Sequence, residues 1–113
     1  MTLDSFFSTC DFHDSLISNI SLNEDRIVMT VDFCAWRQDD YVETEPETER
    51  VSLIFEDASD YDGVLGAIDD YSILDVDLNG NVVTFNLCDD LNDAYYQIRF
   101  RAGSARFDRG SFD

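Results

Sequence analysis

Two alternating runs of residues around Asn79-Gly80 constrain the fold of this chain more than any other feature. Apolar and polar residues alternate over residues 74–78, and a second apolar run follows at residues 82–85. Apolar residues at every second position are typical of a strand with one face in a core. Asn-Gly readily adopts the two positive φ angles of a type I′ turn, so the segment predicts an antiparallel β-hairpin.

The same period of two marks four further segments, at residues 16–22, 26–36, 51–56 and 95–102. The first two are joined through Asn23-Glu24-Asp25 and predict another hairpin. Together these runs predict a mainly β (α+β) fold with an antiparallel sheet of about six strands, rolled or sandwich-like. The strand order stays open.

Two short segments have the period of a helix instead. Each places four apolar residues at i, i+3, i+4 and i+7, which is one helical stripe. The stripes are Leu3, Phe6, Phe7 and Cys10, and then Tyr61, Val64, Leu65 and Ile68. We expect two short helices that cover an end or a face of the sheet, although Gly63 and Gly66 each cost a helix about 1 kcal/mol relative to Ala.

The length of 113 residues predicts a single domain, residues 1–113. Residues 37–50 hold the only proline and many acids, and we expect an acidic loop there. Residues 103–113 have no clear period and predict an irregular tail. No stretch approaches the roughly 20 apolar residues of a membrane span, and the N-terminus lacks a basic signal-peptide region. We therefore expect a cytoplasmic protein without membrane association.

The charge is extreme, with 25 acidic residues against seven basic ones and a formal net charge of -18. Solubility of a small domain needs a net charge of only about 2 to 8 in magnitude. Such a chain should repel nucleic acid and attract a basic partner. We expect cross-strand pairing of Arg99 and Arg101 with Asp32 and Glu56, which leaves most acids unneutralised.

Motifs for catalysis or metal binding are weak. Asp75-x-Asp77-x-Asn79-Gly80 matches the first half of an EF-hand loop, but the last ligand position falls on Asn86, and strands flank the motif. A hairpin with solvated aspartates is the preferred interpretation, and a metal or small-ligand module ranks last. His13 is the only histidine, and the three cysteines form no Cys-x-x-Cys pair. The sequence predicts no enzyme, no cofactor and free thiols.

The segment Phe12-His13-Asp14-Ser15-Leu16-Ile17, followed by alternating strands and a closing Tyr96-x-Ile98-x-Phe100, resembles small bacterial immunity proteins of polymorphic toxin systems. The resemblance covers roughly residues 10–102 as a pattern, and identity is limited to the short His-Asp-Ser element. It implies a mostly β protein that binds a cognate toxin and blocks it. His13, Asp14 and Ser15 correspond to a structural element at the start of the first strand.

We therefore expect an acidic inhibitor or immunity protein that binds a basic partner, such as a toxin nuclease, by electrostatic docking. Two alternatives stay open: a nucleic-acid mimic that blocks a defence protein, and a domain from a high-salt cytoplasm whose charge serves solvation. The predicted partner-binding residues are acids of the loop and of two Asp-Asp pairs, with two aromatic anchors: Asp39, Asp40, Glu43, Glu45, Glu47, Asp69, Asp70, Asp89, Asp90, Trp36 and Tyr41.

Overall fold

The computed structural model describes residues 2–9, 12, 15–34, 48–63, 66–89 and 91–108. Within these ranges the chain forms one helix and eight strands. Helix α1 spans Leu3–Thr9, and the strands are β1 (Leu16–Asn23), β2 (Arg26–Cys34), β3 (Thr48–Glu56), β4 (Ser59–Asp62), β5 (Gly66–Asn79), β6 (Val82–Asp89), β7 (Ala94–Arg101) and β8 (Ser104–Asp108). The prediction of a mainly β, antiparallel fold is confirmed.

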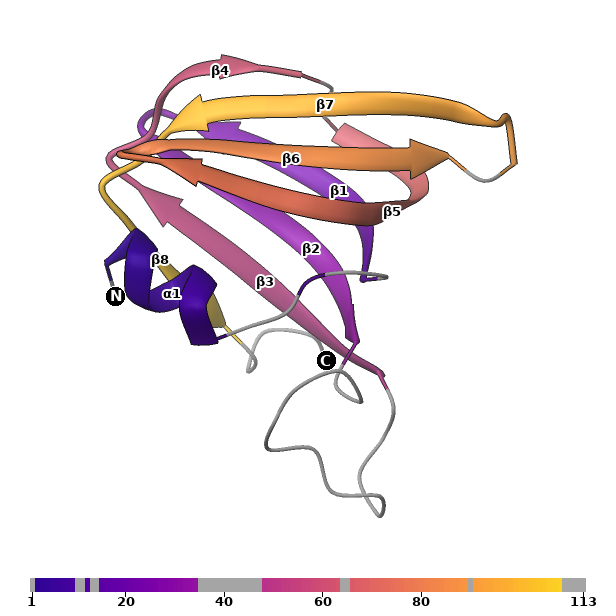
Figure 1. Cartoon of the computed structure of the whole chain (residues 1–113), viewed down its shortest axis with the longest axis horizontal. Helices are drawn as coiled ribbons and strands as arrows, with labels where there is room; N and C mark the ends of the chain where they lie inside the picture. The colour runs from indigo at the N-terminus through magenta and orange to yellow at the C-terminus, as the bar shows by residue number, and fades with distance from the viewer. Residues whose placement is uncertain are drawn as a thin grey trace.

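All eight strands belong to one sheet with the order β4-β7-β6-β5-β1-β2-β3-β8, and every pairing is antiparallel. Hairpins connect β1 to β2, β5 to β6 and β6 to β7 (Figure 1). The two hairpins predicted from the sequence are therefore confirmed. The sheet has more strands than the predicted six. The two additional strands are β4 and β8, which form its two edges.

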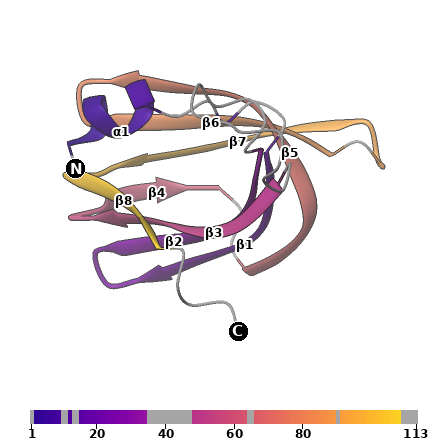
Figure 2. The same cartoon turned by 90° about the horizontal axis from the view of Figure 1, so that it is seen from below.

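Strand β5 joins the two halves of the sheet. Its first part pairs with β1 up to Ser72, and its second part pairs with β6 from Ser72 to Asn79. The register shifts between Ile73 and Asp75, as at a β-bulge, and bulges bend a strand and increase its twist. Figure 2 shows β5 curving from the layer of β6 and β7 round to the layer of β1 and β2.

The bent sheet folds its inner faces onto each other. Phe55 of β3 and Phe85 of β6 are separated by three strands in the sheet, yet their ring centroids lie 6.1 Å apart. Phe100 of β7 is 4.9 Å from Phe55 by the same measure. The alternating apolar residues of β2, β3, β6 and β7 thus form one core between the two halves. Burial of apolar area from both halves supplies the main stabilisation of the fold.

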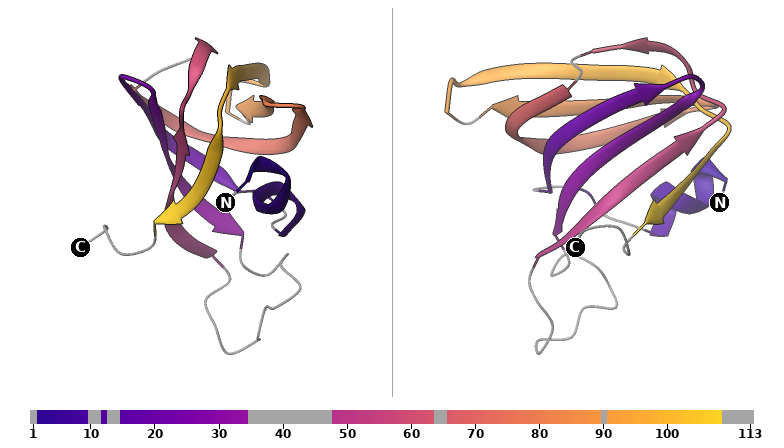
Figure 3. Two further views of the ribbon diagram at one scale, coloured as in Figure 1. Left: turned by 90° about the vertical axis from the view of Figure 1, so that its left-hand side faces the viewer. Right: turned by 180° about the vertical axis from the view of Figure 1, so that it is seen from behind.

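Helix α1 lies in the open side of the curled sheet and contacts β5 and β8 (Figure 3). Phe6 is fully buried, and its ring centroid lies 4.8 Å from that of Phe107 in β8 and 6.1 Å from that of Phe55. Phe7 reaches Phe85 at 6.3 Å. The predicted first helix is confirmed, and its apolar stripe closes the aromatic core.

The predicted second helix is wrong. Ser59–Asp62 forms the edge strand β4, which pairs with β7 through Ser59 opposite Arg101 and Asp62 opposite Arg99. Positive φ angles at Asp60, Gly63 and Gly66 interrupt any helical turn. The edge of β7 offers unpaired backbone groups, and pairing with them outweighs a short helical stripe that contains two glycines. Tyr61 then packs on Phe100 with 6.1 Å between ring centroids.

Two predicted boundaries also change. Residues 48–50, assigned to the acidic loop, belong to β3, where Arg50 pairs with Asp32 in the register of the sheet. Residues 104–108, assigned to the irregular tail, form β8 on the outer edge of β3. Residues 35–47 and 109–113 lie outside the described part of the chain.

The turn between β5 and β6 is shifted by one residue from the prediction. Asn79 pairs with Val82, so Gly80 and Asn81 are the central residues instead of Asn79 and Gly80. Gly80 has a φ of 64°, at the first central position, where both primed hairpin turns need a positive φ. The hairpin is as predicted, and the glycine still provides the conformation that the turn requires.

Backbone hydrogen bonds fix the start of β1. The amide of Ser15 donates to the carbonyl of Phe12 at 3.0 Å, and the Ser15 carbonyl accepts from the amide of Ile73 at 2.8 Å. His13 and Asp14 lie outside the described residues. Cys88 is a buried free thiol. No helix in the described ranges is long and apolar enough to cross a membrane.

Candidate protein-interaction surfaces

Most of the predicted partner-binding residues fall outside the described part of the chain. These are Trp36, Asp39, Asp40, Tyr41, Glu43, Glu45, Glu47 and Asp90. The backbone of Asp69 and Asp70 lies within β5, where the structure describes no side-chain positions for these two residues. Of the predicted residues, only Asp89 has a described side chain.

Asp89, a predicted partner-binding residue, does not face solvent. Its side chain is only 3% exposed, at the end of β6. One carboxylate oxygen accepts from the backbone amide of Leu91 at 3.1 Å, and the other accepts from the side-chain amide of Asn92 at 2.7 Å. Carboxylates often hold turns in this way, through bonds to residues two or three positions ahead. Asp89 therefore shapes the β6–β7 turn.

The turn between β6 and β7 and the first part of β7 present apolar and aromatic side chains to solvent. Leu91 is 86% exposed, Tyr95 is 71% exposed and Tyr96 is 37% exposed. Figure 1 shows this hairpin projecting beyond the other strands at one end of the molecule. We call Leu91, Tyr95 and Tyr96 the aromatic tip. Tyr95 and Tyr96 are successive residues of β7 and so lie on opposite faces of the strand. Exposed tyrosines are enriched at protein-binding surfaces.

Tyr96 is held in place by Tyr71 of β5. Their rings are stacked, with centroids 4.8 Å apart and planes 5° from parallel. Tyr96 shares a strand face with Ile98 and Phe100, which are fully buried. The inner face of β7 thus passes from the core to a partly exposed aromatic pair, so Tyr96 is the member of the aromatic tip that adjoins the core.

Acidic side chains gather at the opposite end of the molecule. The β1–β2 turn carries Glu24 and Asp25, and the connection from β3 to β4 carries Asp57. The amide of Ala58 donates to the carbonyl of Asp25 at 2.6 Å and ties the two turns together. All three acids are exposed and form no ion pair with any described residue. We call them the acidic end; Arg26 is their neighbour in sequence.

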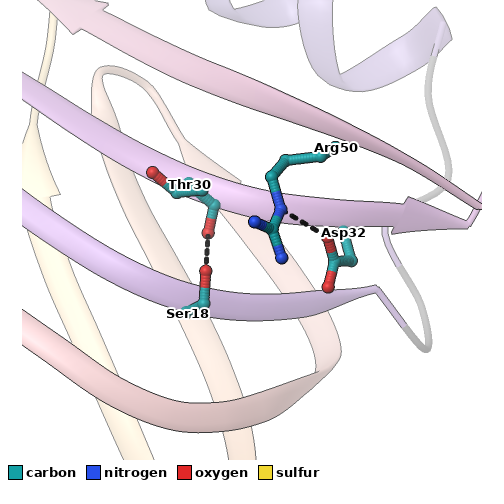
Figure 4. A network of polar contacts seen from close by, with 4 residues as sticks. All are labelled: Ser18, Thr30, Asp32 and Arg50. Atoms are coloured by element: carbon teal, nitrogen blue, oxygen red, sulfur yellow. Dashed lines mark hydrogen bonds and ion pairs between the residues drawn. The ribbon is translucent and has the colours of Figure 1, made fainter. Parts of the chain in front are cut away.

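Three described arginines, Arg50, Arg101 and Arg106, pair with acids of the chain, but not with the predicted partners. Arg50 Nε lies 3.1 Å from Asp32 Oδ1 on β2 (Figure 4), Arg106 Nε lies 3.0 Å from Glu56 Oε1, and Arg101 Nε lies 3.2 Å from Asp60 Oδ2. The expected pairing of Arg99 and Arg101 with Asp32 and Glu56 is wrong. The strand order separates β7 from β2 and β3, so those carboxylates meet arginines of β3 and β8 instead.

The pairing with Arg106 has an electrostatic consequence. The hydrogen bond from the guanidinium of Arg106 lowers the pKa of Glu56 below its usual value. Both side chains are well exposed, so water and salt screen the pair and its contribution to stability is small.

A shallow polar depression of about 680 Å³ covers the outer face of β5, β6 and β7. Its lining includes Asp75, Asp77 and Asn79 from the EF-hand-like motif, and Arg99 from β7. The side-chain amide of Asn86 donates to the carboxylate of Asp75. Alternate residues of one strand do not converge on a point as the ligands of a calcium loop do. The described residues contain no group of three or more His, Cys, Asp or Glu side chains placed to hold a metal ion.

The sequence interpretation missed both the aromatic tip and the acidic end. A leucine between acids in a turn at Asp89–Asp93 was an available signal, since turn residues are usually polar. The acidic end had no such signal, because it forms only when two turns distant in sequence meet. No protein-family model, curated protein sequence or solved structure matches this chain.

Proposed function

We propose that this protein binds and blocks a basic protein partner, such as a toxin nuclease. The observation that carries the proposal is the distribution of charge on the described surface. Arg50, Arg101 and Arg106 are paired within the chain. The exposed acids of the acidic end, and Asp75 and Asp77 on the outer face of β5, form no ion pair with a described arginine. The surplus negative charge is therefore open to a partner.

An uncompensated acidic surface favours one class of partner. Charge complementarity accelerates association by about 10- to 1000-fold, and it disfavours partners of like charge. An enzyme that acts on nucleic acid needs a basic cleft to hold phosphates. A folded acidic domain seated on such a cleft excludes the substrate by occupying its place. This mode of inhibition requires no catalytic residue in the inhibitor.

The test is an affinity experiment with salt elution. The whole chain is immobilised, exposed to an extract of its own cells at about 50 mM NaCl, and eluted with about 500 mM NaCl, where screening shortens to a few ångströms. A toxin domain encoded beside the chain, if there is one, is tested as a purified protein in the same way. We expect a basic protein to be retained, eluted by salt and inhibited by an equimolar amount of the chain.

A matched variant separates docking from general acidity. Glu24→Gln, Asp25→Asn and Asp57→Asn together remove the charges of the acidic end and nearly keep its shape. The variant should associate more slowly with the purified partner, and its association should depend less on salt. If no basic protein is retained by the wild-type chain, the proposal is refuted. In that case the charge serves another purpose, such as solvation in a high-salt cytoplasm.

A further inference from the structure

We infer that the aromatic tip of the β6–β7 hairpin is the anchor by which this protein holds its basic partner. The inference rests on the proposed function and assigns the short-range part of that interaction. Charge attraction accelerates the association of the partner. The lifetime of the complex depends instead on desolvated contacts near the centre of the interface. The tip supplies the kind of side chains that make such contacts.

The first support is the exposure of the tip. Leu91 is 86% exposed and Tyr95 is 71% exposed, and Tyr96 and Tyr71 extend the same end of the sheet as a stacked pair. Tyrosine offers a large contact area with few rotatable bonds and a hydroxyl that can reach a polar rim. The β6–β7 hairpin that carries these residues projects beyond the other strands (Figure 1).

The second support is the rigidity of the turn. The buried carboxylate of Asp89 binds the amide of Leu91 and the side chain of Asn92. Asp93 has a φ of 51°, in the left-handed region that few residues other than glycine, Asn and Asp adopt readily. These bonds fix the backbone of the turn at Leu91 before any partner arrives. A preorganised contact loses less entropy on binding, which lengthens the lifetime of a complex.

The charge around the aromatic tip indicates which class of molecule binds there. Residues 86–96 contain three acids and no basic residue; Asp89 is buried, and Asp93 is exposed beside Leu91. Association of two copies of the chain would bring two bodies of net charge -18 together, and nucleic acid or an anionic membrane would be repelled in the same way. A basic protein with an apolar pocket rimmed by arginine or lysine fits both the leucine and the acids beside it.

The experiment measures dissociation. The probe is the purified protein recovered by salt elution in the preceding experiment, bound to immobilised wild-type chain and to three variants. The tip variant is Leu91→Ala with Tyr95→Ala. The control is Leu22→Ala, which truncates a leucine that is 43% exposed on β1. The third is the acidic-end variant described above. Unchanged far-ultraviolet circular dichroism shows that each is folded, and Leu91→Ala alone replaces the double variant if that one is destabilised.

We expect the tip variant to raise the dissociation rate constant by about 10-fold or more, as the loss of interface anchors does, with a nearly unchanged association rate constant. The acidic-end variant should do the reverse, and Leu22→Ala should resemble wild type. If a partner is recovered and the tip variant dissociates at the wild-type rate, the anchor is refuted while the proposed function stands. If no basic partner is recovered, both are refuted.

Discussion

Replacement of Asp89 by alanine should destabilise the protein, although aspartate is a surface residue in most proteins. Asp89 is 3% exposed, and its carboxylate accepts two hydrogen bonds, from Leu91 and Asn92. A hydrogen bond to a charged group contributes about 1.5–3 kcal/mol in a buried setting. Leu91 and Asn92 are exposed, so water can satisfy their donors in the variant and reduce the loss. We therefore expect Asp89→Ala to lower the free energy of unfolding by about 2 kcal/mol.

Asp89→Asn should cost about half as much, because the amide keeps one acceptor oxygen and can serve only one of the two donors. For a domain of this size, a loss of 1 kcal/mol corresponds to a drop in melting temperature of about 4 °C. Urea unfolding followed by circular dichroism measures both effects. A shift of the midpoint at constant slope shows that stability itself changes.

Asn92→Ala tests the mechanism. Asp89 and Asn92 share one of the two bonds, so the double variant should be less destabilised than the sum of the single variants by about 1 kcal/mol. Asp77→Ala, an exposed position on β5, is the control and should stay within about 0.5 kcal/mol of wild type. The account of the turn is refuted if Asp89→Ala behaves like Asp77→Ala, or if Asp89 and Asn92 show no coupling.

Three further predictions concern the fold. Phe55→Ala should lower the free energy of unfolding by about 3–5 kcal/mol, because this fully buried ring joins both halves of the sheet. Leu22→Ala is its control, and equal effects in urea unfolding would contradict the folded-over core. The melting temperature should rise from low to moderate NaCl as repulsion is screened; a fall would contradict that expectation. Burial raises the pKa of Tyr61 from 10.0 to about 12, so its neutral form is favoured in the folded state. The resulting stability is complete below pH 10 and is lost as the pH rises towards 12. Tyr61→Phe should therefore flatten the decline of stability in that range, and an unchanged pH profile would exclude the effect.

Local pattern predicted those parts of the fold that depend on local chemistry. The alternation at Ile27, Met29 and Val31 placed one face of β2 in the core, and all three are fully buried. The stripe through Phe6 predicted α1, and the glycine at position 80 predicted a hairpin turn. In each case the preference arises within a few residues, from side-chain periodicity or from the φ angle that a turn requires.

Local pattern failed where pairing with a distant strand decided the conformation. The stripe through Tyr61 fits a helix, but the free edge of β7 and the positive φ angles around it make Ser59–Asp62 a strand. Ser104–Asp108 has too short a pattern to predict a strand, yet it pairs along β3. Backbone groups at a sheet edge gain hydrogen bonds from whichever segment reaches them, and no local window contains that information.

The candidate surfaces also depend partly on the sequence alone and partly on the tertiary structure. Composition alone determines that the protein is strongly acidic and that its partner must be basic if charge drives binding. Tertiary structure decided that Asp89 is buried, that Leu91 and Tyr95 of the β6–β7 hairpin are exposed, and that two distant turns meet at the acidic end. The net charge is a sum over residues and can be calculated without knowledge of the fold. Whether a side chain is buried or exposed depends on how the sheet bends at β5.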